Sequence, residues 1–270
     1  MLVSYHNHTV WSDGRPEISD LAEKARTAGV RELGISDHFA ITPDRQSPSW
    51  SIQPERLSAY VDAVLSTARN TDGLTIRLGV EVDYFPETLE ESIRLLKPYP
   101  FDYIIGSVHF IDGFSIDMNS DSWKTLSQKE RNWAWKTYWM HIADAAKSGY
   151  FDFIAHFDLP KKFEFYPDID LTPNAVAALD AIAATDTAIE INTSGWYKPV
   201  KEAYPSFFYI REARRRNIPL LINADSHHSG HVVRDFKRAR KLATAAGYTE
   251  LARYEKRKRF SYPLSSSVPV

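Results

Sequence analysis

Seven short apolar runs follow one another along the chain, and most of them stop at a histidine or a carboxylate. Runs of this length, bounded by polar residues, are typical of buried β-strands. The predicted strands cover residues 2–5, 30–36, 74–80, 103–108, 153–155, 188–191 and 219–224. The sixth run is the exception, because it ends at Asn192. Packing gives no reason for such strand ends, whereas a metal cluster at one edge of a parallel sheet does.

Segments with helical spacing of apolar residues separate these runs. In 16–28, for example, the apolar side chains fall on one face, and Gly29 ends the helix. Ser127 and Glu130 have capping-box spacing, and Thr172-Pro173 is typical of a helix start. The predicted helices cover residues 16–28, 54–69, 87–96, 127–148, 172–184, 204–216 and 233–246.

Strands and helices therefore alternate from one end of the chain to the other. This order predicts right-handed crossovers and a parallel sheet with helices outside. We expect an α/β fold with a single domain over 1–270, in the form of a (β/α)7 TIM-like barrel with its core at about 1–247. The alternative is an open doubly wound sheet, but too many strands carry ligand-type residues to meet at one crevice. The tail, 253–270, is expected to pack at one edge and to fray at its end.

The composition limits the chemistry to non-sulfur ligands. The chain has no cysteine, so a metal must be bound by His, Asp or Glu, which favours zinc, manganese or iron. The net charge of −2 and the absence of a long apolar run argue against nucleic-acid and membrane partners. The start of the chain has no signal-peptide pattern, and we expect a cytoplasmic protein.

Nine residues at or near the strand ends are candidate metal ligands. Two of them, His6 and His8, are two positions apart on an extended strand and so point to the same side. Asp13 lies in an Asp-Gly turn that can fold back over them. The candidates are His6, His8, Asp13, His38, Glu81, His109, His156, Asp225 and His227.

Taken together, these motifs resemble those of the polymerase and histidinol phosphatase (PHP) superfamily. The resemblance covers Met1 to about Gly247 and rests on segments 6–9, 12–14, 36–38, 107–109, 156–158 and 225–227, with Glu81. Segment 189–195 and Tyr204-Pro205 are similar to the histidinol-phosphate phosphatase branch in particular. The resemblance implies a distorted (β/α)7 barrel with three divalent metal ions.

The resemblance also implies how the ligands are shared. His6, His8, Glu81 and Asp225 would hold the first ion. Glu81 would bridge to a second ion with His109 and His156. Asp13, His38 and His227 would hold a third, more exposed ion. Some family members have His where this chain has Asp13, so the third site is expected to differ in strength.

A cluster of this kind is suited to the hydrolysis of phosphate monoesters. Two close metal ions lower the pKa of a bridging water and clamp the phosphate oxygens. We expect a metal-dependent phosphomonoesterase with Glu81, Asp225 and His227 as catalytic residues. The resemblance implies L-histidinol phosphate, an intermediate of histidine biosynthesis, as the small-molecule substrate. The alternatives are a related phosphoesterase acting on nucleotides, a metal-dependent amidohydrolase and a barrel without activity.

Basic residues in two loops are candidates for holding the phosphate. Lys161 matches a position where relatives carry a basic anchor, and Lys198 follows Asn192 in the loop after the sixth strand. We expect Lys161, Lys198 and Asn192 to bind substrate, and Asp158 or Glu164 to meet its amine. His228 and His231 are candidate general acids. The aromatic cluster around His141 is expected to serve packing.

Overall fold

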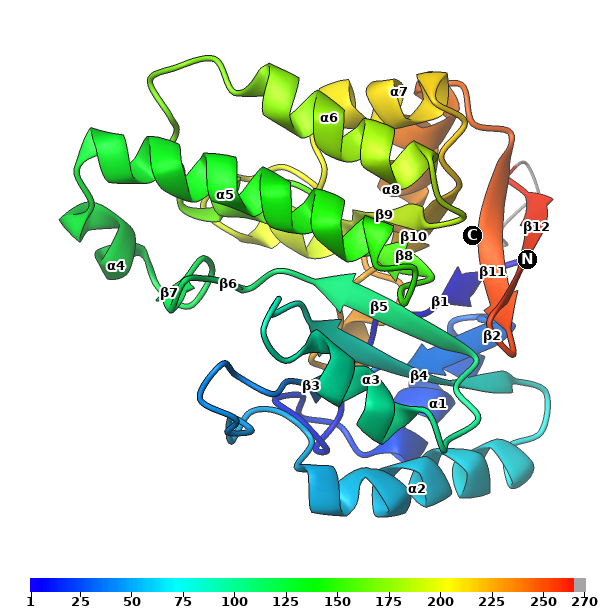
Figure 1. Ribbon diagram of the computed structural model, residues 1–270. Coiled ribbons are helices and arrows are strands. Elements are labelled where there is room, and N and C mark those ends of the chain that lie inside the picture. The colour runs from blue at the N-terminus through cyan, green and yellow to red at the C-terminus, as the bar shows by residue number, and fades with distance from the viewer. Residues whose placement is uncertain (265–270) are drawn as a thin grey trace.

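The computed structural model describes residues 1–264 of the chain, and its centre is one nearly closed parallel barrel (Figure 1). Seven strands pair side by side in the order β1-β2-β4-β5-β8-β9-β10. Their bounds are Val3–Ser4, Glu32–Ile35, Thr75–Asp83, Tyr103–Ser107, Phe153–Ile154, Ala188–Asn192 and Leu220–Asn223. The predicted TIM-like (β/α)7 fold is confirmed, and each strand overlaps the run that predicted it.

The first and last strands meet only at the edge where both end. Asn7 and Ser226 form an isolated parallel bridge, in which the backbone amide of His8 donates to Ser226 O at 2.8 Å. The flanking residues are His6 and His8 on one side and Asp225 and His227 on the other. The barrel therefore closes at the row of candidate ligands.

Seven helices follow the strands as predicted and form the outer layer (Figure 1). They are α1 (Ile18–Thr27), α2 (Leu57–Arg69), α3 (Leu89–Leu96), α5 (Gln128–Lys147), α6 (Thr172–Ala183), α7 (Phe207–Arg215) and α8 (Phe236–Ala245). Ser127 and Glu130 form the predicted capping box at the start of α5. No helix in residues 1–264 is long and apolar enough to cross a membrane.

Stacked aromatic rings fill the barrel interior. The ring of Tyr103 stacks on Tyr5, with centroids 4.8 Å apart, and Phe153 continues the stack at 5.9 Å. Tyr103 fits because two glycines lie against its ring, namely Gly79, its partner on β4, and Gly34 on β2. A Cβ atom on Gly34 would lie 1.9 Å from Tyr103 Oη, and one on Gly79 would lie 2.1 Å from Tyr103 Cζ. These two glycines therefore make room for the central ring.

A hairpin that the sequence did not predict covers the opposite end of the barrel. Strands β11 (Glu250–Glu255) and β12 (Lys258–Pro263) pair antiparallel beside β10 and near the N-terminus (Figure 1). Tyr254 joins the interior, where its backbone amide donates to Tyr5 Oη at 3.1 Å. Most of the tail is therefore ordered structure, and the predicted fraying concerns residues 265–270, which lie outside the described part.

Short elements that the sequence did not predict shape the loops beyond the ligand edge. The loop after the second strand holds β3 (His38–Phe39), which pairs with β4 so that His38 lies opposite Glu81. The loop after β5 contains β6 (Phe110–Ile111), β7 (Phe114–Ser115) and α4 (Ser120–Thr125). Within residues 1–264 there are also four short 3-10 helices: η1 (Pro54–Arg56), η2 (Leu159–Phe163), η3 (Thr193–Tyr197) and η4 (Ser229–His231).

Candidate metal centre and its pocket

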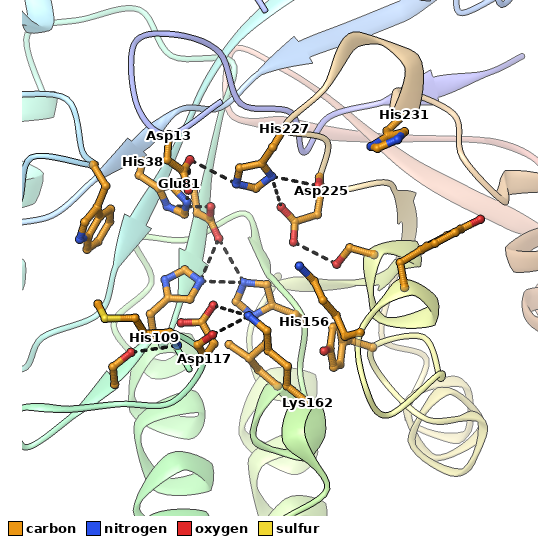
Figure 2. A pocket seen from close by; sticks show the side chains of 18 of the residues that line it. Asp13, His38, Glu81, His109, Asp117, His156, Lys162, Asp225, His227 and His231 are labelled. Atoms are coloured by element: carbon orange, nitrogen blue, oxygen red, sulfur yellow. Dashed lines mark hydrogen bonds and ion pairs between the residues drawn. The ribbon is translucent and has the colours of Figure 1, made fainter. Parts of the chain in front are cut away.

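The side chains of all nine candidate ligands gather at the ligand edge of the barrel. Figure 2 shows seven of them, namely Asp13, His38, Glu81, His109, His156, Asp225 and His227. Glu81 lies at their centre. Its Oε2 is 3.1 Å from His6 Nε2 and 3.0 Å from His38 Nδ1, and its Oε1 is 3.2 Å from His156 Nε2. A carboxylate whose two oxygens face different imidazoles connects separate parts of the cluster.

The other candidates fall into groups around Glu81. The Oδ1 atom of Asp225 lies 3.4 Å from His8 Nε2 and 3.7 Å from His6 Nε2. On the opposite side, the Nε2 atoms of His109 and His156 lie 3.1 Å apart. Nearer to solvent, Asp13 Oδ1 is 3.2 Å from His227 Nε2 and 3.7 Å from His38 Nε2.

Several ligand atoms in this cluster lack a hydrogen-bond partner. Four of these buried atoms are His6 Nε2, His8 Nε2, His38 Nδ1 and Glu81 Oε2. Buried polar atoms without partners are rare in folded proteins, because each one loses its interaction with water. Imidazole nitrogens and carboxylate oxygens that face one another at such distances are satisfied together by a cation. The cluster therefore fits divalent metal ions.

Carboxylates behind the cluster fix the orientation of its imidazoles. Glu190, in the middle of β9, lies with Oε1 3.1 Å from His6 Nδ1, and Asp83 Oδ1 lies 2.7 Å from His109 Nδ1. Because a carboxylate only accepts, each Nδ1 carries a proton, and Nε2 is the ring nitrogen that faces the cluster. The sequence analysis missed both carboxylates, although an acidic residue inside an apolar run was a usable signal for Glu190.

The electrostatics of the cluster attract positive charge. Burial would lower the pKa of His109, but Asp83 overcomes it and raises this pKa to about 10. Burial likewise opposes a proton on His227, yet Asp13 and Asp225 raise its pKa to about 9. Burial would raise the pKa of the Glu81 carboxyl, but the surrounding histidines hold it well below its usual value. Glu81 is therefore ionised throughout the physiological range.

A buried network holds the turn that carries Asp13. The Asp37 carboxylate accepts hydrogen bonds from the backbone amide of Thr9 and from the hydroxyl of Ser12, both at 2.7 Å. Gly14 lies too close to the backbone of His8 for any side chain, because a Cβ atom would come within 2.3 Å of its carbonyl carbon. This contact explains the Asp-Gly sequence of the turn.

The domain model that matches this chain is the one described as "PHP domain", and it covers residues 4–194. The chain belongs to the PHP family. A probable histidinol-phosphatase of Deinococcus radiodurans is 33% identical over 88% of this chain and 90% of that protein. A histidinol-phosphatase of Bacillus subtilis is 26% identical over 78% of this chain and 87% of that protein.

A solved structure agrees with the fold of this PHP protein. Histidinol phosphate phosphatase from Lactococcus lactis subsp. lactis, crystallised with zinc, L-histidinol and phosphate, superposes with a TM-score of 0.77. The match covers 96% of this chain and 98% of the other, with 20% sequence identity. At this identity the likeness establishes the shared barrel.

A cavity of about 550 Å³ opens beside the ligand cluster of the PHP domain (Figure 2). Glu81, His109, His156, Asp225 and His227 face it directly. The candidate ligands Asp13 and His38 line it as well. Its other lining residues with titratable side chains include Asp117, Lys162, Lys198, His231 and Arg234, and its aromatic lining residues are Trp50, Phe110, Tyr197 and Tyr204. The cavity therefore combines the ligand cluster, a group of cations and an aromatic wall.

Lys161, which was predicted to bind the phosphate, does not line this cavity. Its ammonium is buried on the other side of η2, 2.7 Å from Glu202 Oε2 and 2.9 Å from Asp158 Oδ2. The neighbouring Lys162 lines the cavity instead. In a 3-10 helix successive side chains are about 120° apart, so adjacent residues cannot share a side. The same turn directs Asp158 away from the cavity, and Glu164 does not line it either.

Some of the remaining predicted residues line the cavity, and others lie outside it. Lys198 lines the cavity, and burial followed by the nearby charge of Lys162 lowers its pKa. Asn192 is buried below, where its amide nitrogen donates to Glu190 Oε1 at 2.8 Å and to Asp225 Oδ2 at 3.2 Å. Of the two candidate general acids, His231 lines the cavity and His228 does not. His141 contacts Tyr84 edge to face, away from the cluster.

Proposed function

We propose that this protein is a metal-dependent phosphomonoesterase that hydrolyses L-histidinol phosphate to L-histidinol and phosphate. The observation that carries the proposal is the convergence of nine ligand-type side chains beside a cavity that also holds Lys162 and Lys198. The substrate follows from the relatives, whose named activity is histidinol-phosphatase over nearly the whole chain. An enzyme in this role acts in histidine biosynthesis.

The distances support three groups of ligands. In the first group, His6 and His8 face Glu81 Oε2, and Asp225 lies beside both histidines. In the second group, His109 and His156 face Glu81 Oε1. Asp13, His38 and His227 form the third and most exposed group. We propose one divalent ion for each group, with zinc, manganese or iron as candidates. When bound, such ions lower the pKa of water and offset negative charge on the phosphate.

The lysines of the cavity hold the phosphate dianion in this proposal. Lys198 is partly buried in the cavity, and its lowered pKa reflects the loss of hydration and the repulsion of Lys162. Two ammonium groups that repel each other and are poorly hydrated gain when an anion lies between them. Arg234, which lines the same cavity and lies 3.8 Å above the ring of Tyr197, adds a third positive charge.

The aromatic wall receives the alcohol part of the substrate. Trp50 and Phe110 stack with their planes 8° apart, and Trp50 also covers the edge of His38. A flat imidazole fits against rings of this kind, since aromatic groups bury large apolar areas and stack in offset geometry. His231 lies at the same cavity and is the residue we propose as proton donor to the leaving oxygen.

Phosphate release from a panel of esters tests this function. The purified protein, loaded with zinc or manganese, is assayed with L-histidinol phosphate, adenosine monophosphate and 4-nitrophenyl phosphate. We expect kcat/KM for L-histidinol phosphate to exceed the others by at least tenfold. Equal rates on all three esters would contradict the substrate, and preference for the nucleotide would favour the related phosphoesterase. A protein that releases phosphate from none of them is not a phosphatase.

A further inference from the structure

Asp117 is a carboxylate that lines the cavity but is not one of the proposed metal ligands. Among the described residues, four carboxylates line the cavity, and the other three are the proposed ligands Asp13, Glu81 and Asp225. Asp117 lies in the loop that follows β5, in the segment between β7 and α4. Figure 2 shows it beside Lys162, below His109 and His156.

Lys162 is the counter-ion of Asp117 in the structure. The Lys162 ammonium donates to Asp117 Oδ2 at 3.0 Å and to the backbone carbonyl of Asp117 at 2.6 Å. Burial would raise the pKa of Asp117, but His109 and Lys162 lower it. The Asp117 carboxyl is therefore ionised, and the side chain of Lys162 is only 13% exposed. Neither charge is easily left without a partner at this depth.

A phosphate that takes Lys162 as an anchor therefore creates a problem for Asp117. Lys162 would turn toward the phosphate dianion. The negative carboxylate of Asp117 would then lose its counter-ion and lie close to the two negative charges of the phosphate. The repulsion disappears if the ester itself carries a positive charge that replaces the ammonium of Lys162. The number of ion pairs then stays the same before and after binding.

We propose that Asp117 is the binding site for a protonated amine on the alcohol part of the substrate, so that the cavity selects zwitterionic phosphate esters. The inference rests on the proposed function and refines its substrate class. An ester with both a phosphate dianion and an ammonium exchanges partners with the Asp117–Lys162 pair. An ester without the amine leaves Asp117 unpaired beside the phosphate and is rejected, because specificity arises from unpaired charge as much as from new contacts.

The test compares two esters on wild-type protein and on Asp117→Asn. The first ester is L-histidinol phosphate, and the second is 3-(imidazol-4-yl)propyl phosphate, which lacks only the amine. Asp117→Asn keeps the backbone carbonyl that holds Lys162. We expect the variant to lose about tenfold to hundredfold in kcat/KM on the first ester, with the loss mainly in KM. On the second ester, kcat/KM should stay unchanged or rise.

Asp112→Asn is the matched control, because Asp112 is exposed on the same loop and does not line the cavity. Its kinetics on both esters should match those of the wild type. An equal loss on both esters in Asp117→Asn would overturn the inference, since Asp117 would then act only by holding Lys162. Equal wild-type activity on both esters would overturn the inference while leaving the phosphatase activity standing. Failure of the wild type on both would instead overturn the proposed function.

Discussion

Glu190 holds the imidazole of His6 from behind, with Oε1 and Oε2 at 3.1 and 3.2 Å from Nδ1. The same carboxylate accepts from the backbone amide of His156 at 3.1 Å and from the amide nitrogen of Asn223 at 2.8 Å. It therefore connects β9 with two strands that carry proposed ligands, although β9 itself carries none. Glu190 fixes the tautomer of His6 and the path of the chain at His156.

Glu190→Gln should weaken metal binding without unfolding the barrel. An amide in place of the carboxylate no longer favours the tautomer that presents His6 Nε2, and it removes a negative charge behind the cluster. We expect zinc affinity to fall about 10- to 100-fold, as for other residues that orient metal ligands. Competition with a fluorescent chelator measures this change. Glu250→Gln, on the exposed end of β11, is the control and should bind zinc like the wild type.

Alanine substitution of the two adjacent lysines should affect different properties, namely activity for Lys162 and stability for Lys161. Lys162→Ala removes a proposed phosphate anchor, and kcat/KM for L-histidinol phosphate should fall about 10- to 100-fold, as expected for one charged hydrogen bond. Lys161→Ala leaves the buried carboxylate of Asp158 without its ion-pair partner and should destabilise the fold by about 3 kcal/mol. Steady-state kinetics and urea unfolding separate the two effects. A large kinetic loss confined to Lys161→Ala would contradict the placement of these side chains.

The barrel interior should not tolerate a methyl group at Gly34. The new Cβ atom would overlap the hydroxyl of Tyr103, which itself donates to Tyr5 O at 2.5 Å and is fixed by its stacking. Overpacking of a rigid core costs about 1 to 3 kcal/mol, so Gly34→Ala should lower the free energy of unfolding by at least that amount. Gly230→Ala, where the nearest atom to a new Cβ lies at 3.5 Å, should unfold like the wild type.

Asp152 should make stability depend on pH in a direction opposite to that of most carboxylates. Burial raises its pKa to about 6, although Arg257 opposes the shift. The folded state therefore binds a proton that the unfolded state releases near pH 4, and the stabilisation present below about pH 4 is lost as pH rises through 6. A shift of this size corresponds to about 3 kcal/mol. Relative to the wild type, Asp152→Asn should gain about 2 to 3 kcal/mol between pH 4 and pH 7 in urea unfolding. A difference in the free energy of unfolding between the two proteins that stays constant from pH 4 to pH 7 would contradict the raised pKa of Asp152.

The strands and the ligand edge could be predicted because both correspond to local patterns in the sequence. Apolar runs give the strands, and residues such as His109 and Asp225 follow directly after them. Helix ends such as Ser127 follow from local capping, which needs no tertiary contact. These features depend on residues close together in the chain, and for that reason they can be read without the fold.

Other features depend on contacts between distant segments. Lys161 and Lys162 are neighbours of the same type, and only the direction of η2 decides which one faces the cavity. Asp117 reaches the cavity because its loop crosses over from the end of β5 to the end of β8. The hairpin at the opposite end of the barrel carries many charged residues, and it packs through distant contacts such as the one between Tyr254 and Tyr5.

In the proposed function, ions held by the nine ligand-type side chains carry out phosphate ester hydrolysis. The most direct measurement is phosphate release from L-histidinol phosphate by protein stripped with a chelator and then titrated with zinc or manganese. We expect the stripped protein to be inactive, and activity to return in proportion to bound metal up to two or three ions per chain. Full activity in protein holding less than about 0.1 ion per chain would contradict the claim.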